Sequence, residues 1–129
     1  MHSILIIDDD PKICLTLKLW LESDGDKIVR IHNRARLGLI SALRSRPDLI
    51  ILDYEMPGLD GLSLQEKLGR WQRTRFIPVV MLTGNQESKT RETALYQYAE
   101  RFLVKPTSRE ALLACINRIL NTRHKEKAV

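Results

Sequence analysis

Short runs of apolar residues alternate along this chain with longer segments in which apolar residues recur at helical spacing. Because Ile, Leu and Val fill these runs almost without interruption, we interpret them as β-strands that are covered on both faces. A strict alternation of strands and helices is typical of a parallel sheet with helices on both sides. The predicted strands are Ser3 to Ile7, Lys27 to Ile31, Leu49 to Leu52, Ile77 to Leu82 and Arg101 to Val104.

The intervening segments carry start and stop signals for helices. Asp10 before Pro11 predicts a side-chain N-cap followed by proline at the first helical position. Thr107 and Glu110 form a capping box that predicts the start of the last helix. The other helices are expected at Ala35 to Ser45, from Asp60 to near Gly69, and at Glu87 to Tyr98. The apolar residues expected on the core side of the second and third helices are Leu39, Ile40, Leu43, Leu64 and Leu68. Together these elements predict an α/β fold with a doubly wound, five-stranded parallel sheet.

The length and charge of the chain restrict its domain organisation and its possible partners. The 129 residues fit one domain, which we place at residues 1–121, with 122–129 as a basic tail or the start of a linker. The net charge of +5 raises affinity for acidic or phosphate-rich partners, but no nucleic-acid reading module accompanies it, which argues against direct nucleic-acid binding. No apolar run approaches the roughly 18 residues of a membrane helix, so we expect no membrane association and a soluble, cytoplasmic protein.

Cys14 and Cys115 are interpreted as small buried hydrophobic residues.

Four of the predicted strands are followed by polar residues able to take part in chemistry. Asp8 and Asp9 follow the first strand, Asp53 the third, Thr83 the fourth and Lys105 the fifth. Because the carboxyl ends of parallel strands meet at one edge of the sheet, we expect these residues to form one site. Like charges disfavour each other's ionisation, so three aspartates at one place require a cation. Hard carboxylate oxygens, with no His or Cys at a strand end, favour Mg²⁺ or Mn²⁺ over zinc.

The remaining polar residues of this site indicate phosphate chemistry. A lysine and a hydroxyl beside a cation can stabilise a transferring phosphoryl group, and a carboxylate can accept it. Asp53 is the expected nucleophile, because it ends the most hydrophobic strand and the turn YEMPGLDG follows it closely.

The chain resembles the receiver domains of bacterial two-component response regulators over residues 3 to about 121. The motifs that carry the resemblance are a pair of aspartates after the first strand, D-x-x-M-P-G-x-D-G after the third, T-G after the fourth and K-P after the fifth. Their common order and spacing make the resemblance specific. It implies a flavodoxin-like fold with five βα units and the strand order 2-1-3-4-5.

The resemblance also implies the roles of the acidic residues. Asp53 would be the phosphoacceptor and would take its phosphoryl group from a phosphohistidine on a sensor histidine kinase or a histidine phosphotransfer protein. Asp9 would bind Mg²⁺ directly and Asp8 through water. Asp53 and the backbone carbonyl of Glu55 would complete the metal ligands of the protein.

Further residues acquire roles from the same resemblance. Thr83, Gly84 and Lys105 would bind the phosphoryl group, and Pro106 is a candidate for a cis peptide bond. Thr83 and Phe102 would form the switch, in which the hydroxyl moves toward the phosphate and the ring turns inward. This reshapes the face built from the fourth helix, the fifth strand and the last helix, which would then act on a partner, a homodimer mate or an output domain. Such a protein catalyses its own phosphorylation and dephosphorylation but is not a turnover enzyme.

Three alternatives are open at this stage. A metal-dependent phosphohydrolase would need a second aspartate two residues after its nucleophile, where this chain has Glu55. A flavodoxin-like electron carrier would need a hydroxyl- and glycine-rich phosphate loop after the first strand, where this chain has DDDPK. A pseudo-receiver would act as an interaction module without phosphorylation. The chain also departs from the usual receiver pattern at Tyr98, where a glycine commonly precedes the alanine, and in its positive net charge.

Overall fold

The computed structural model describes residues 1–54, 56, 61–84, 101–105 and 107–128. The predicted helix at 87–98 lies outside these residues. In chain order the elements are β1 (His2–Ile7), α1 (Pro11–Glu22), β2 (Lys27–His32), α2 (Ala35–Ser45), β3 (Leu49–Asp53), α3 (Gly61–Arg70), β4 (Val79–Thr83), β5 (Arg101–Val104) and α5 (Arg109–Ala128).

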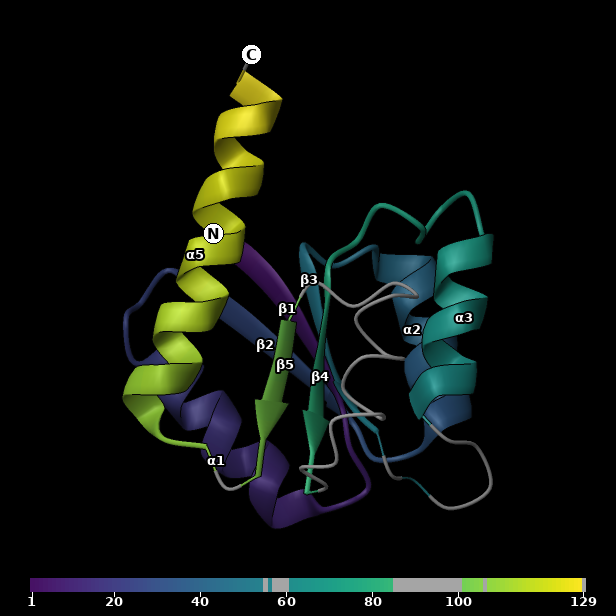
Figure 1. Cartoon of the computed structure of the whole chain (residues 1–129), viewed down its shortest axis with the longest axis horizontal. Helices are drawn as coiled ribbons and strands as arrows, with labels where there is room; N and C mark the ends of the chain where they lie inside the picture. Colours follow the sequence, from purple (N-terminus) through teal and green to yellow (C-terminus); the bar gives the residue numbers. More distant parts are fainter. Residues whose placement is uncertain (55, 57–60, 85–100, 106, 129) are drawn as a thin grey trace.

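The strands form one parallel sheet in the order β2-β1-β3-β4-β5, which confirms the predicted strand order (Figure 1). In the register of the sheet, Ile7 lies opposite Leu52, and Leu52 lies opposite Met81. The carboxyl ends of β1, β3 and β4 therefore meet at one edge, which we call the carboxyl edge. The opposite edge, where the strands begin, is called the amino edge.

Alternate strand residues enter two separate hydrophobic cores. On β1, Ile4 and Ile6 pack in the core that contains residues of α1 and α5, whereas Leu5 and Ile7 pack in the core that contains residues of α2 and α3. Figure 1 shows these two pairs of helices on opposite sides of the sheet. Because successive side chains of a strand point to opposite faces, continuous apolar strands are what two covered faces require.

α1 and α3 follow their predicted signals, whereas the predicted core face of α2 needs a correction. Asp10 caps α1, since its carboxylate accepts hydrogen bonds from the backbone N–H groups of Lys12 and Ile13. On α3, Leu64 and Leu68 are buried as predicted. The prediction that Ile40 faces the core is wrong, because its side chain is 39% exposed. The buried residues of α2 are the small ones: Ala35, Gly38 and Ala42.

Gly38 explains why small residues face the sheet on α2. A Cβ added there would lie 2.6 Å from both Cγ1 and Cδ1 of Ile7, far inside ordinary contact distance. The backbone of α2 therefore comes close to β1, and larger residues such as Leu37 and Ile40 are turned outward.

α2 ends in an uncommon way. Arg46, its C-cap, has a φ of 46° and a ψ of 68°, and its backbone N–H donates to the carbonyl of Ala42 at 3.0 Å. The left-handed conformation satisfies a helix-end carbonyl, but it costs a residue with a Cβ about 1 kcal/mol relative to glycine.

The boundaries of β4 and α5 differ from the predictions. β4 begins at Val79 rather than Ile77, because Pro78 has no N–H and the N–H of Ile77 donates to Thr74 in the preceding turn. The predicted capping box at Thr107 is wrong by one residue. The hydroxyl of Ser108 accepts the N–H of Ala111, and the helix starts at Arg109.

α5 continues through residues 122–128, where the sequence suggested a tail. The domain boundary at residue 121 stays a prediction. Among the described helices, none combines the length and the apolar character needed to cross a membrane.

Candidate functional site

Three aspartates come together at the carboxyl edge of the sheet. Asp8 follows β1, and Asp53 is the last residue of β3 on the neighbouring strand. One carboxylate oxygen each from Asp8, Asp9 and Asp53 lies within 4.8 Å of the others. Asp8 is 0% exposed and Asp53 2%, whereas Asp9 is exposed to solvent. The structure thus brings together the acidic residues that the sequence placed in one site.

The turn between β1 and α1 holds Asp8 in place. Its Oδ1 accepts the backbone N–H of Asp10 at 3.0 Å, and its backbone carbonyl accepts the side-chain amide of Asn33 at 2.9 Å. The thiol of Cys14 donates to the same carbonyl at 3.4 Å. Burial, followed by the negative charges of Asp8 and Asp10, raises the pKa of the Cys14 thiol to about 12. Cys14 is therefore a neutral, structural thiol near neutral pH.

The sequence reasoning missed Asn33 and the contact of Cys14. Asn33 directly follows β2, which neighbours β1 in the sheet. The same rule that selected polar residues at the ends of the other strands could have found it. A contact between Cys14 and a backbone carbonyl has no comparable signal in the sequence.

Lys105 supplies the positive charge of the site. Its Nζ lies 3.0 Å from Oδ2 of Asp8 and 3.1 Å from Oδ1 of Asp53, and its side chain is 22% exposed. Burial opposes the charged ammonium, but hydrogen bonds and charge interactions with Asp8 and Asp53 outweigh this, so the pKa of Lys105 is raised. Lys105 is therefore held as a cation between two buried carboxylates.

Thr83 and Gly84 lie beside this pair. Thr83 is the last residue of β4 and is fully buried, and its carbonyl accepts the N–H of Lys105 at 2.7 Å. Gly84 follows on the exposed edge, where a Cβ would meet no described atom within 4 Å. Phe102 is the second residue of β5 and lies opposite Met81 in register, but its side chain falls outside what the structure describes. Glu55 and Pro106 also lie outside the described residues.

The donor set fits a hard divalent cation. All three side-chain ligands are carboxylates, and the single ammonium of Lys105 cannot balance them. Oxygen ligands without nitrogen or sulfur suit hard cations such as Mg²⁺, Mn²⁺ and Ca²⁺ rather than zinc. Two of the carboxylates are buried, so an added cation would interact with them more strongly than with exposed groups.

Comparisons with known proteins agree with this geometry. The profile of the response regulator receiver domain matches residues 4–117. Protein PilH of Pseudomonas aeruginosa is 32% identical over 120 residues, which are 93% of this chain and 98% of PilH. The transcriptional regulator RpaA of Synechocystis is 35% identical over 120 residues, but the match covers only 49% of that protein. The chain therefore spans nearly all of one relative and about half of the other.

Solved structures of similar proteins superimpose closely on this chain. The CheY-like receiver domain protein of Methanospirillum hungatei superimposes with a TM-score of 0.89 at 28% identity, over 98% of both chains. The chemotaxis protein CheY4 of Vibrio cholerae gives a TM-score of 0.85 at 28% identity, over 92% of this chain and 98% of CheY4.

Proposed function

Because the chain belongs to the response regulator receiver family, we propose that it is a phosphorylation-controlled signalling switch whose phosphoacceptor is Asp53. The observation that carries the proposal is the shared contact of Lys105 with Asp8 and Asp53, at 3.0 and 3.1 Å. Receiver membership implies a histidine kinase as a partner.

Asp8, Asp9 and Asp53, together with the backbone carbonyl of Glu55, would hold Mg²⁺ or Mn²⁺. When bound, the ion supplies positive charge beside the oxygens of the transferring group. The rest of the chemistry belongs to the side chains of the chain itself.

Transfer to Asp53 exchanges one bond to phosphorus for another. A carboxylate oxygen of Asp53 forms the new bond while the phosphorus–nitrogen bond of a phosphohistidine breaks, and the departing imidazole nitrogen keeps the electron pair and takes up a proton. Lys105 exchanges its contact with Oδ1 of Asp53 for one with a phosphoryl oxygen, and Thr83 donates its hydroxyl hydrogen to another. The phosphoryl group stays on the protein, so Asp53 is an acceptor and not the nucleophile of a turnover enzyme.

The change at Asp53 would be transmitted through β5, the edge strand beside β4. The carbonyl of Thr83 accepts the N–H of Lys105, so a movement of Thr83 toward the phosphoryl group is coupled to the end of β5. We propose that Phe102 on β5 reports this movement to the face that includes β5 and α5. A homodimer mate or an output domain would bind there.

The phosphohistidine donor would dock beside α1. A hollow of about 420 Å³ is lined mainly by apolar surface, to which Ile13, Leu17 and Trp20 contribute, and Lys105 also lines it. Because Lys105 also touches Asp53, a protein seated in this hollow can bring a histidine to the acceptor. The exposed Thr16 lines the same hollow. Thr16→Glu should therefore slow transfer from a phosphohistidine protein, while loading by the small donor phosphoramidate stays unchanged.

Intact mass after incubation with acetyl phosphate and Mg²⁺ tests the proposal. We expect one added phosphoryl group on the wild-type chain and none on Asp53→Asn. Asp10→Asn is the matched control, since it removes a carboxylate from the same edge but retains a good helix cap, and it should still be phosphorylated. An equal mass gain in Asp53→Asn would overturn the assignment of the acceptor.

A further inference from the structure

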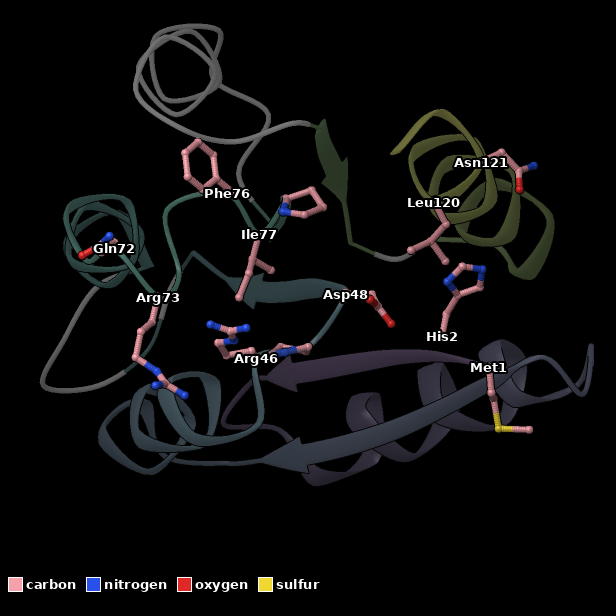
Figure 2. Close-up of a pocket in the computed structure, with 12 residues that line it drawn as sticks. Met1, His2, Arg46, Asp48, Gln72, Arg73, Phe76, Ile77, Leu120 and Asn121 are labelled. Carbon is pink, nitrogen blue, oxygen red and sulfur yellow. The ribbon is translucent and has the colours of Figure 1, made fainter. Parts of the chain in front are cut away.

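A second hollow lies at the amino edge of the sheet, at the opposite ends of the strands from Asp53. It has a volume of about 700 Å³ and is open to solvent. Figure 2 shows the residues that line it, which come from the start of β1, the α2–β3 connection, the α3–β4 connection and α5. We call it the amino-edge hollow and define it by Arg46, Asp48, Arg73, Phe76 and Leu120.

The charge of this hollow is positive. Arg46 and Arg73 contribute two guanidinium groups, and Asp48 is the only acidic residue among the described lining. The carboxylate of Asp48 already accepts the backbone N–H of Ser3 at 2.7 Å. Within the described ranges, no ion pair joins either arginine to a carboxylate. The hollow therefore complements an acidic ligand.

Both arginines are set in place by the backbone. Nε of Arg73 donates to the carbonyl of Leu43 in the last turn of α2 at 3.1 Å, which ties the α3–β4 connection to α2. Arg46 occupies the left-handed C-cap of α2, where glycine is the common residue. A guanidinium is thus retained at a position where the backbone favours a residue without a side chain, and such outliers often mark functional positions.

Apolar groups accompany the arginines. Phe76 is 69% exposed, and the guanidinium carbon of Arg75 lies 4.7 Å from the centroid of its ring. The described lining also contains Met1 and Leu120, but no Lys, Glu, Ser or Ala. Aromatic residues, Met and Arg are enriched at protein–protein interfaces, whereas Lys, Glu, Asp, Ser and Ala are depleted there, and Asp48 is the only member of the depleted group among the described lining.

We propose that the amino-edge hollow docks an acidic segment of a partner protein, with carboxylates on Arg46 and Arg73 and an apolar side chain against Phe76. Guanidinium groups suit this role because they bind carboxylates through paired hydrogen bonds. A nucleic acid fits less well, since the positive charge forms a bounded hollow rather than a stripe. The proposal does not depend on phosphorylation of Asp53.

Peptide selection tests this proposal on the whole chain. A random peptide library displayed on phage would be selected against the wild-type protein, and the enriched peptides would be synthesised and measured by fluorescence anisotropy. We expect enriched peptides that combine Asp or Glu with an aromatic or aliphatic residue. Their dissociation constants should rise at least about tenfold in Arg46→Gly and about fivefold in Phe76→Ala.

Two controls separate docking from folding and from net charge. Arg46→Gly relieves the left-handed backbone, so its melting temperature should not fall while its affinity does. Arg36→Gln removes one exposed charge about 15 Å away along α2 and should change affinity by less than about twofold. The proposal is overturned by an empty selection, by peptides without acidic residues, by peptides that bind Arg46→Gly as well as wild type, or by a single-stranded oligonucleotide that binds more tightly than the peptides through Arg46.

Discussion

The carboxyl edge and the amino-edge hollow differ in how their charged groups are exposed to solvent. At the carboxyl edge, Asp8 and Asp53 are almost completely buried and share the ammonium of Lys105. At the amino edge, Arg46 and Phe76 lie on the surface. A buried charge without a partner destabilises the folded state strongly, whereas an exposed charge stays hydrated. Substitutions should therefore change stability mainly at the carboxyl edge and binding mainly in the amino-edge hollow.

The largest expected effect is that of Lys105→Met without metal. The substitution leaves two buried carboxylates without their cation. Breaking a buried pair costs about 3–5 kcal/mol, and the partial exposure of Lys105 reduces this to about 2–3 kcal/mol of unfolding free energy. Urea unfolding measures the loss. Mg²⁺ should stabilise Lys105→Met more than wild type, because the ion replaces the lost charge.

The exposed Lys67 on α3 provides the control for this comparison. Lys67→Met should leave the unfolding free energy within about 0.5 kcal/mol of wild type. Equal metal-free stabilities of Lys105→Met and Lys67→Met would show that the carboxyl edge does not need its internal cation.

The next largest effect is expected for Gly38→Ala. The new Cβ would overlap Ile7, and overpacking costs about 1–3 kcal/mol against a gain in helix propensity of about 1 kcal/mol. Since Ile7 directly precedes Asp8, Mg²⁺ affinity should fall as well. Denaturant unfolding and metal titration measure both effects. In an Ile7→Ala background the added Cβ should cost much less, and the same cost in both backgrounds would exclude the overlap as its cause.

A smaller effect of opposite sign is expected for Arg46→Gly. Removing the Cβ from the left-handed C-cap should raise the unfolding free energy by about 0.5–1 kcal/mol. The same substitution two residues earlier, Arg44→Gly, lies inside α2 and should lower it by about 1 kcal/mol. Thermal unfolding of the two variants measures this difference in stability. A loss of stability in both would contradict the backbone strain at Arg46.

The smallest effect is expected at acidic pH, for the contribution to stability of Asp26, which directly precedes β2. The hydrogen bond to the ammonium of Lys27, which is buried, lowers the pKa of Asp26 below its ordinary value of 3.8. Because the folded-state pKa is the lower one, this contribution to stability is complete above pH 3.8 and is lost as the pH falls below it. Asp26→Asn should therefore flatten the stability of the chain against pH slightly in this acidic range, as measured by urea unfolding. An unchanged slope would contradict the role of this contact.

Much of the fold could be predicted because the apolar pattern is strong. The strands, their parallel arrangement and the buried positions Leu64 and Leu68 follow from runs and spacings of large apolar residues, whereas the strand order followed from the family resemblance. The core face of α2 could not be predicted in this way, since Gly38 and Ala42 carry little hydrophobic signal and contact the sheet because they are small. Hydrophobicity alone therefore selected Ile40, which is exposed.

The sequence predicted the location of the candidate site more completely than the contacts within it. The rule for parallel strands brought Asp8, Asp53 and Lys105 together, as the structure does. It gave no indication that Lys105 bridges both carboxylates, because rotamers depend on burial and charge in the folded chain. The roles of Phe102 and Glu55 stay predictions.

The position of β3 has a mechanical consequence. All five of its residues are buried, and it is hydrogen-bonded to β1 on one side and β4 on the other. Because β3 is held on both sides, it is rigid. It cannot bend to relieve the force that the charge of a phosphoryl group on Asp53 would exert. The displacement must appear in the edge strands β2 and β5, which the sheet holds by one neighbour only, and of these two it is β5 that leads directly into Lys105 in contact with Asp53.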